Sequence, residues 1–269
     1  MKQAMKALNR AVALAGLFGP GYVMRWMSGS AGQPVLPAAL SGIGPIWLRK
    51  NSTDGEVFRQ VFQNREYELR SLRRFADIQA RYEALLDAGR LPVVVDAGAN
   101  IGAASLWFAN IFPRAHVVAI EPEPANVAMC RRNIANRPSI SLLEAAVGSS
   151  SGRVSLNNPA GMAWSPRSVR SDDGNIEVVT IQDAVDEVPN GQLFIVKMDI
   201  EGFESDVFAS GTEWIDDTTV LIIEIHDWMR PGAETSFTLQ RAMSDRRFEI
   251  LISGENLIYL NTKLLGAPR

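Results

Sequence analysis

Short apolar runs alternate with amphipathic helical segments from Val93 onward, and this alternation constrains the fold more than any other feature of the chain. The apolar runs are typical of strands that are buried on both faces, and they cover residues 93–95, 117–120, 140–147, 193–198 and 220–225. Helical periodicity falls between and after them, at residues 101–112, 124–136, 181–185, 203–210 and 237–243. Strands that alternate with helices in this way predict a doubly wound α/β fold with a mostly parallel sheet.

Two further pairs of strands are expected around this core. Residues 153–156 and 176–180 read as paired or edge strands. Residues 248–252 and 257–260 read as a hairpin that turns at Gly254-Glu255-Asn256. The hairpin adds antiparallel strands to the parallel ones, so we expect a seven-stranded Rossmann-like sheet.

The first 90 residues differ in character from the rest. Residues 54–86 have helical periodicity, and Gly89 and Pro92 end that segment. Residues 11–18 are apolar and follow three basic residues, but Gly19-Pro20-Gly21 ends the run, which is shorter than the ~20 residues of a membrane span. We therefore expect an amphipathic extension over 1–36 that is able to touch a membrane surface, a helical extension or lid over 37–90, and the core over 91–269.

Charge and cysteine content limit the function classes. Lys and Arg outnumber Asp and Glu by 13 to 7 in residues 1–90, and are outnumbered by 14 to 23 in residues 91–269. A basic segment can indicate an anionic partner, but its Arg residues are interspersed with acids, which favours a solvated helix face. The acidic core argues against nucleic acid as a partner. A single cysteine, Cys130, excludes an intrachain disulfide and favours a reducing compartment, so we expect a cytoplasmic protein.

Polar residues follow the predicted strands where each one ends. The carboxyl ends of parallel strands form the ligand-binding edge of such sheets. We therefore expect one site to contain Asp96, Glu121, Glu144, Asp199 and His226.

The loop after the first strand favours S-adenosylmethionine over a dinucleotide. Gly98 and Gly102 permit a sharp turn, but the spacing Gly-x-Asn-x-Gly lacks the Gly-x-Gly-x-x-Gly fingerprint of NAD sites. The carboxylate of Asp96 would repel a phosphate and attract a cationic ligand, and S-adenosylmethionine carries an ammonium, a sulfonium and no phosphate. Glu121 lies 25 residues further on, where a carboxylate can bind two ribose hydroxyls. An NAD-dependent dehydrogenase is the alternative.

Several motifs together resemble the FkbM-type S-adenosylmethionine-dependent methyltransferases. The resemblance covers roughly residues 91–262, and its motifs are VVDAGANIGAAS (94–105), AIEPEP (119–124), AAVG (145–148), TIQD (180–183) and IVKMDIEGFE (195–204). It implies a class I methyltransferase fold and methyl transfer to a hydroxyl of a sugar, a glycan precursor or a secondary metabolite. The TIQD segment departs from the commoner family pattern, so the resemblance assigns no role to Asp183.

The resemblance also implies which residues hold the cofactor. Asp96, Gly98, Asn100 and Gly102 would hold its amino-acid end, and Glu121 would hold the ribose. The adenine would lie against Pro122 and the segment Glu144-Ala145-Ala146, and Asp199 would face the methyl group.

The acceptor side is less defined. His226 and Asp199 compete for the role of general base, and Lys197, inside an apolar strand, is either paired with a carboxylate or a catalytic amine. Glu201 is either a helix cap or a substrate contact, and Trp164 and Trp228 are candidates for the acceptor pocket.

Other assignments stay open. A divalent metal could bind among Asp199, Glu201, Glu224, His226 and Asp227, but strand-end carboxylates are common without metal, so we do not favour one. The alternatives in function are an N-methyltransferase and a catalytically silent cofactor-binding module. The acceptor's identity and the oligomeric state do not follow from the sequence.

Overall fold

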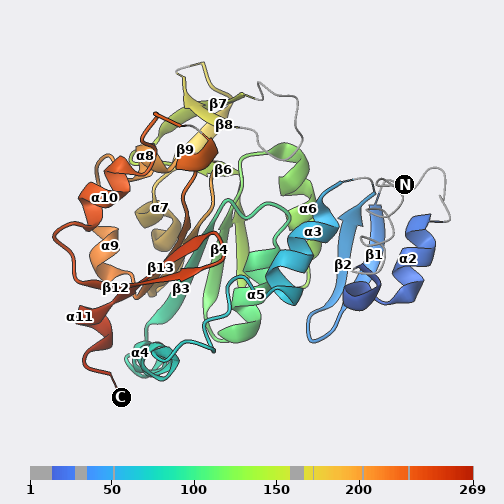
Figure 1. Ribbon diagram of the computed structural model, residues 1–269, viewed down its shortest axis with the longest axis horizontal. Coiled ribbons are helices and arrows are strands. Elements are labelled where there is room, and N and C mark those ends of the chain that lie inside the picture. The colour runs from blue at the N-terminus through green and yellow to red at the C-terminus, as the bar shows by residue number, and fades with distance from the viewer. Residues whose placement is uncertain are drawn as a thin grey trace.

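The computed structural model describes residues 14–27, 35–50, 52–157, 167–171, 173–201, 203–229 and 231–268. Its centre is a seven-stranded sheet with the order β12-β13-β11-β10-β3-β4-β5 (Figure 1). The parallel strands are β3 (Leu91–Ala97), β4 (His116–Ile120), β5 (Ile140–Leu143), β10 (Gly191–Met198) and β11 (Val220–Glu224). The antiparallel pair is β12 (Phe248–Ser253) and β13 (Asn256–Asn261). The predicted α/β class, the mostly parallel seven-stranded sheet and the terminal hairpin are confirmed.

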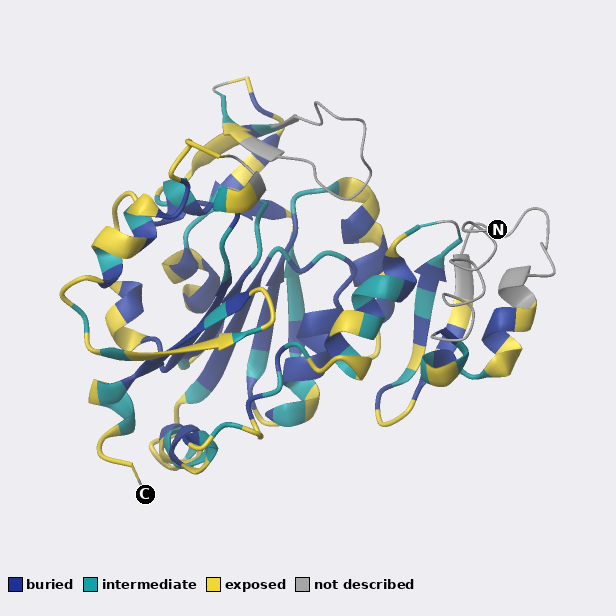
Figure 2. Cartoon of the chain, viewed as in Figure 1, coloured by how far each residue is buried: buried dark blue, intermediate teal, exposed yellow. Residues whose placement is uncertain are grey.

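Helices cover both faces of this sheet, because successive strand residues point to opposite faces. In β3, Val94 packs with one hydrophobic cluster, whereas Val93 and Val95 pack with the other. The first cluster includes side chains of α4 (Phe75–Asp87), α5 (Ala103–Ile111) and α6 (Pro124–Ile134). The second includes side chains of α7 (Ile181–Asp186), α8 (Glu204–Val207), α9 (Trp214–Asp217) and α10 (Phe237–Met243). Figure 2 shows the buried strands between these two layers.

The expected strand over 140–147 is divided between two sheets. Its first half is β5, and its second half is β6 (Ala145–Val147), which belongs to a four-stranded sheet ordered β6-β9-β7-β8. The other strands of that sheet are β7 (Gly152–Asn157), β8 (Arg167–Arg170) and β9 (Ile176–Val179). The predicted pairing of 153–156 with 176–180 is confirmed, since β7 and β9 are antiparallel neighbours. Asp183 completes a capping box with Thr180 at the start of α7, which gives the TIQD segment a structural role.

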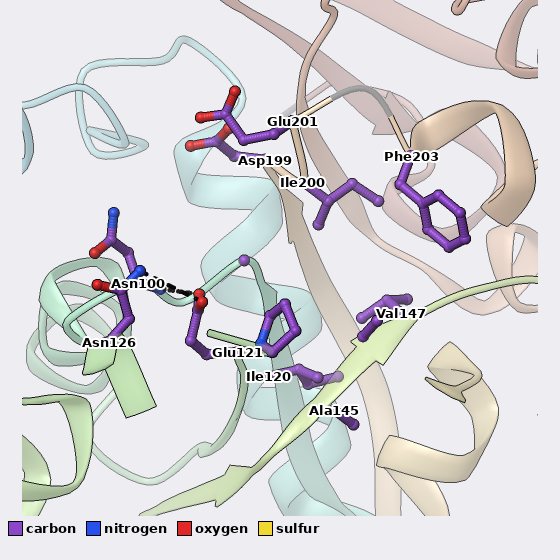
Figure 3. A pocket seen from close by; sticks show the side chains of 13 residues that line it. Asn100, Ile120, Glu121, Asn126, Ala145, Val147, Asp199, Ile200, Glu201 and Phe203 are labelled. Carbon is purple, nitrogen blue, oxygen red and sulfur yellow. Dashed lines mark hydrogen bonds between the residues drawn. The ribbon is translucent and has the colours of Figure 1, made fainter. Parts of the chain in front are cut away.

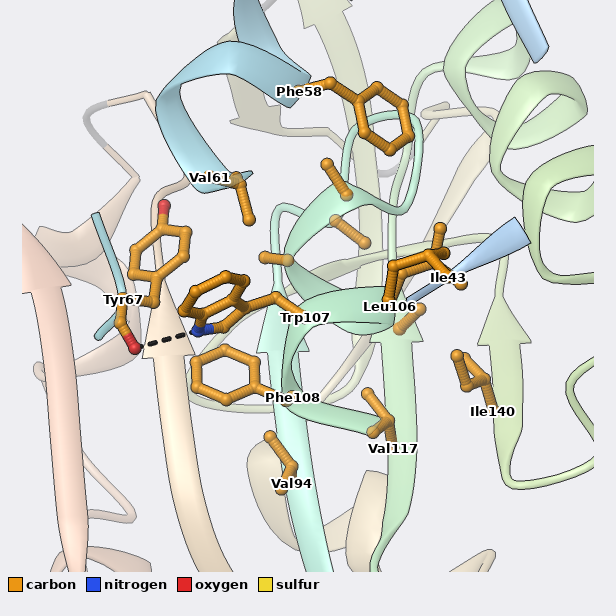
Figure 4. Packing of buried hydrophobic residues seen from close by; sticks show 14 of the residues in the cluster. Ile43, Phe58, Val61, Tyr67, Val94, Leu106, Trp107, Phe108, Val117 and Ile140 are labelled. Carbon is orange, nitrogen blue, oxygen red and sulfur yellow. Dashed lines mark hydrogen bonds between the residues drawn. The ribbon is translucent and has the colours of Figure 1, made fainter. Parts of the chain in front are cut away.

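The prediction of one helix over 54–86 is wrong in its middle. The chain forms α3 (Asp54–Phe58) and the π-helical turn η1 (Arg59–Gln63), leaves helical structure, and resumes at α4. Arg65 has a left-handed backbone (φ 56°), which ends the first segment. Tyr67 and Leu69 are then buried, and the Tyr67 carbonyl accepts a hydrogen bond from the Trp107 indole (2.9 Å; Figure 4). Burial of these side chains in a loop produced the apolar spacing that resembled a helix.

An antiparallel hairpin precedes this segment, where a helical extension was expected. It consists of β1 (Val35–Leu40) and β2 (Gly44–Arg49), joined at Gly42 and Gly44, which both have positive φ. Ile46 and Leu48 alternate inward and are fully buried. Helix α2 (Pro20–Met27) packs beside it, and Gly19 (φ 80°) separates α2 from the helical residues 14–18, where the sequence predicts a break. The basic residues before Ala11 lie outside the described residues.

None of the helices in the described part of the chain combines the length and apolarity that crossing a bilayer requires. The remaining elements are the short helical segments η2 (Asp227–Met229) and α11 (Thr262–Leu265).

Candidate active site

Two cavities open at the carboxyl ends of the parallel strands, and they share part of their walls. Gly98, Asn100, Asp199 and Glu201 line both of them. The first cavity lies over β3, β4 and β6, and the second lies between the core and the segment 53–67. The shared residues therefore mark the place where a ligand in one cavity meets a ligand in the other.

The first cavity encloses about 610 Å³ of empty space including its open mouth. It contains eight of the residues proposed for the site, namely Gly98, Asn100, Glu121, Pro122, Ala145, Ala146, Asp199 and Glu201. The rest of its wall is mostly apolar and includes Ile120, Val147 and Phe203 (Figure 3). Such a lining has carboxylates at its polar positions and a surface on which a flat apolar group can lie.

Glu121 is the most constrained carboxylate of the first cavity. Its side chain accepts hydrogen bonds from the backbone N–H of Asn100 (2.8 Å) and Glu123 (2.9 Å), and from the amide of Asn126 (3.4 Å). Burial raises the pKa of Glu121 to about 7, although these hydrogen bonds act in the opposite direction. The side chain therefore changes charge near neutral pH and fixes the loop that contains Asn100.

Ligand binding in the first cavity is expected to depend on pH through Glu121. Only the ionised carboxylate can accept hydrogen bonds from two ribose hydroxyls, so the affinity for S-adenosylhomocysteine should rise between pH 6 and 8, by up to about tenfold. Calorimetric titration across this range measures the effect, and Glu121→Gln, which cannot ionise, should flatten it. In the absence of ligand, Glu121 makes the folding stability change with pH in the opposite direction to the affinity. Folding favours the protonated form of Glu121, so its contribution to stability is present below pH 4.5 and is lost as the pH rises through 7. A wild-type affinity that is constant with pH would contradict the assignment of Glu121 to the ribose.

The two glycines of the loop have different roles. A Cβ on Gly98, which has φ +77°, would lie 1.8 Å from the backbone oxygen of Asp199, so the glycine is required for β3 and β10 to end side by side. A Cβ on Gly102 would lie 3.0 Å from the Cys130 sulfur. Gly102 is therefore packed against α6 and is not among the residues that line the cavity.

Asp96 points into the core rather than toward the first cavity. It is fully buried, accepts a hydrogen bond from Ser105 Oγ (2.6 Å) and forms an ion pair with Lys197 (3.1 Å). Lys197 Nζ also donates to the carbonyl oxygen of Gly98 (2.8 Å). Burial alone would lower the pKa of Lys197, but the neighbouring carboxylates, Asp96 first, raise it above its usual value. The ammonium of Lys197 thus stays charged and holds the loop that contains Gly98. Pairing with a carboxylate is one of the two roles that the sequence predicts for Lys197.

The second cavity encloses about 1230 Å³ including its mouth, and its wall is acidic. Its carboxylates are those of Glu56, Glu66, Asp199, Glu201, Glu224 and Glu255. Arg59, Lys197 and His226 are the basic side chains among its lining residues. The second cavity also reaches Tyr67 and the exposed Trp228, so aromatic surface is available for an acceptor.

His226 lies within a group of carboxylates. Its Nδ1 is 2.7 Å from Glu204 Oε1, and its Nε2 faces Glu224 (3.5 Å), Asp199 (3.7 Å) and Glu201 (3.9 Å). Burial alone would lower the pKa of His226, but the Glu204 hydrogen bond and the other carboxylates raise it to about 9. Burial, followed by the charge of Asp199, raises the pKa of Glu224 to about 8. The protonation states of Glu224 and His226 depend on each other, and a protonated His226 by itself would not accept a proton from a hydroxyl.

Of the three other residues that the sequence suggests for the site, the structure describes two. Glu144 is exposed and forms an ion pair with Arg131, and it is not among the lining residues of either cavity. Trp164 lies outside the described residues. Trp228 lies at the second cavity with 66% of its surface exposed.

Sequence reasoning missed contributors that come from distant segments. Asn126 lines the first cavity, and Glu66, Tyr67 and Glu255 line the second. Asn126 accepts a hydrogen bond from Arg49 (2.8 Å), which connects β2 to the Glu121 site. The sequence contains only a weak indication of these four residues. They lie in helices and turns, whereas the sequence argument selects polar residues at the carboxyl ends of strands.

Comparison with known proteins identifies a methyltransferase family. The sequence model of the methyltransferase FkbM domain matches residues 96–250. The chain is 28% identical over 155 residues to the 2-O-methyltransferase NoeI of Sinorhizobium fredii, covering 51% of this chain and 64% of NoeI. It is 29% identical over 157 residues to the hexuronic acid methyltransferase AglP of Haloferax volcanii, covering 56% of this chain and 63% of AglP. The chain thus spans just under two thirds of the length of both curated relatives.

Among solved structures, the bifunctional kinase-methyltransferase WbdD is 16% identical with a TM-score of 0.40, covering 78% of this chain and 41% of that chain. The domain match covers more than half of the 269 residues and includes the end of β3, β4, β10 and β11, with the polar residues at their carboxyl ends. The chain belongs to the FkbM methyltransferase domain family.

Proposed function

We propose that the protein is an O-methyltransferase that transfers the methyl group of S-adenosylmethionine to a hydroxyl of a sugar or glycan precursor. The observation that carries this proposal is the junction of the two cavities at Gly98, Asn100, Asp199 and Glu201. A methyl donor in the first cavity and a hydroxyl in the second would meet there. The names of two relatives, a 2-O-methyltransferase and a hexuronic acid methyltransferase, support a sugar hydroxyl as acceptor.

The first cavity fits the cofactor in its chemistry. The carboxylate of Glu121 suits the ribose diol, and the apolar wall formed by Ile120, Ala145 and Val147 suits adenine. Asp199 and Glu201 add negative charge at the end where the ammonium and sulfonium would lie. In this assignment Asp96 does not contact the cofactor; it supports the loop of the first cavity through its ion pair with Lys197.

S-adenosylmethionine supplies an electrophilic methyl group on a good leaving group. In the transfer, the acceptor oxygen forms a bond to the methyl carbon, the carbon–sulfur bond breaks, and its electron pair stays on sulfur. The protein's residues align the two reactants and take up the hydroxyl proton. Asp199, Glu224 and His226 form the cluster nearest the junction that can do so. We assign the reaction to the cytoplasm, consistent with a chain whose single cysteine, Cys130, is buried and free.

Replacing Asp199 by Asn is expected to lower kcat by at least about 100-fold, because this carboxylate lies at the junction and belongs to the proton-accepting cluster. Binding of S-adenosylhomocysteine should change far less, because the ribose and adenine contacts remain. Transfer of labelled methyl to a panel of neutral, uronic and amino sugars measures kcat, and Glu187→Gln, an exposed residue on α7's end, is the matched control. A folded wild-type protein that binds no S-adenosylhomocysteine would refute the function, and methyl transfer to amines alone would make the protein an N-methyltransferase.

A further inference from the structure

His226 is a buried imidazole with one ring nitrogen fixed and the other facing a cavity. The side chain is 3% exposed, and its Nδ1–H donates to the equally buried Glu204 (2.7 Å). That hydrogen bond sets the ring orientation and leaves Nε2 directed toward the second cavity.

Nε2 has carboxylate oxygens around it but no hydrogen bond among the described residues. Glu224 Oε1, Asp199 Oδ1 and Glu201 Oε2 lie at 3.5, 3.7 and 3.9 Å, and none of these contacts is a hydrogen bond. Nε2 faces the second cavity, so its hydrogen-bonding or ligating capacity is directed at whatever occupies that cavity.

The spacing suits a small divalent cation. Two ligand atoms that both lie about 2.1 Å from one metal ion are separated by about 3.0 Å when adjacent and about 4.2 Å when opposite. The separations from Nε2 to Glu224 and Asp199 fall between these limits, and one donor atom from each of the three residues lies within 4.8 Å of the others. We infer that Asp199, Glu224 and His226 bind a divalent transition-metal cation such as Mn²⁺.

The surroundings of these three residues resemble the outer shell of a metal site. Metal-binding histidines usually donate their second N–H to a carboxylate or carbonyl, as His226 does to Glu204. Glu66, whose carboxylate accepts a hydrogen bond from Asn256 (3.1 Å), and Glu255 place further oxygens within 4.8 Å of Glu224. Both can hold metal-bound water.

Charge points to the same ligand. Six carboxylates line the second cavity, whereas of its two permanently cationic residues Lys197 is already paired with Asp96 and Arg59 lies in the opposite wall, on the segment 53–67. Carboxylates at these separations repel one another, and a dication that replaces a proton on Nε2 would offset that repulsion.

A cation at this position has a direct consequence for the reaction, and that consequence rests on the proposed function. The three ligands lie beside the junction of the cavities, so an acceptor hydroxyl could enter the ion's coordination shell. Coordination lowers the pKa of a hydroxyl, which would then lose its proton to water or to a carboxylate other than the three ligands before attacking the methyl carbon, so in the metal-bound protein Asp199, Glu224 and His226 act as ligands and not as the proton acceptor.

Binding can be tested with Mn²⁺ alone, by following the signal of free Mn²⁺ in electron paramagnetic resonance as wild-type protein is added. We expect one saturable site for Mn²⁺. Asp199→Asn and Glu224→Gln should each weaken Mn²⁺ binding by at least about tenfold. Glu187→Gln, at the C-cap of α7 and not among the lining residues of either cavity, should leave Mn²⁺ binding unchanged.

The variant Glu204→Gln distinguishes a specific metal site from nonspecific attraction of Mn²⁺ to an acidic surface. Glu204 hydrogen bonds to the far side of the His226 ring, so its replacement should still cost about 10-fold to 100-fold in Mn²⁺ affinity. Because Glu204 is buried, circular dichroism must first show that the variant is folded; if it is not, Asp199→Asn, at a half-buried side chain, provides the test.

The absence of saturable Mn²⁺ binding to wild-type protein would overturn the inference. So would equal weakening by Glu187→Gln and Asp199→Asn. Calorimetry with S-adenosylhomocysteine distinguishes this failure from failure of the proposed function: a protein that binds the nucleoside but not Mn²⁺ loses only the metal site.

Discussion

Replacing Lys197 by Met is expected to lower the free energy of unfolding by about 3–5 kcal/mol, because it leaves the Asp96 carboxylate buried without its counter-ion. The methionine retains the length of the side chain, so the loss reflects charge rather than a cavity. The carbonyl oxygen of Gly98 loses its donor in the same substitution. Urea unfolding followed by tryptophan fluorescence measures the change.

The double variant Asp96→Asn/Lys197→Met is the control for this prediction. It contains no unpaired charge, so it should recover a large part of the lost stability, since buried ion pairs are often replaceable as a unit. Glu187→Gln should change stability by no more than about 0.5 kcal/mol. If Lys197→Met alone unfolds at the wild-type urea concentration, the pair does not have the structural role assigned to it.

Replacing Glu121 by Ala is expected to weaken binding of S-adenosylhomocysteine by at least about 100-fold. Hydrogen bonds to a charged group contribute about 1.5–3 kcal/mol each, and the carboxylate would bind two ribose hydroxyls. The substitution also removes the acceptor for the backbone N–H of Asn100, so the loop of the first cavity loses an anchor. Calorimetric titration at pH 8, where most of Glu121 is ionised, gives the full effect.

The affinity of Glu121→Gln for S-adenosylhomocysteine should lie between those of the wild-type protein and Glu121→Ala. The amide oxygen of the glutamine can still accept one hydrogen bond, so the loss of affinity should be smaller than in Glu121→Ala. Thermal unfolding should show that both variants are folded before binding is compared. Equal affinity in wild-type protein and Glu121→Ala would remove Glu121 from the cofactor site.

The strand ends of the candidate site were predictable because they depend on local pattern. An apolar run followed by a carboxylate marks the end of a buried strand, and parallel strands end at one edge. Glu121 and Asp199 were located in this way, and both line the first cavity.

The direction of a side chain at the strand end was not predictable in the same way. Asp96 was expected to face the cofactor, but it turns inward to Lys197, a residue 101 positions away that lies next to it because β3 and β10 are neighbours with Asp96 opposite Lys197. Local sequence does not contain this register. Likewise, Glu66 and Glu255 are far apart in the chain, and only the tertiary fold brings them beside Glu224.

The segment that forms the outer wall of the second cavity has a consequence for the diversity of this family. Thr53, Glu56, Arg59, Gln60 and Tyr67 face the space assigned to the acceptor, yet they all precede the region shared with the family, which begins at residue 96. This part of the wall therefore lies outside the stretch that the family model matches, whereas Asp199, Glu224 and His226 on the opposite side lie within it. A relative that matches over 96–250 can thus differ in one side of the second cavity while the residues at the junction stay the same.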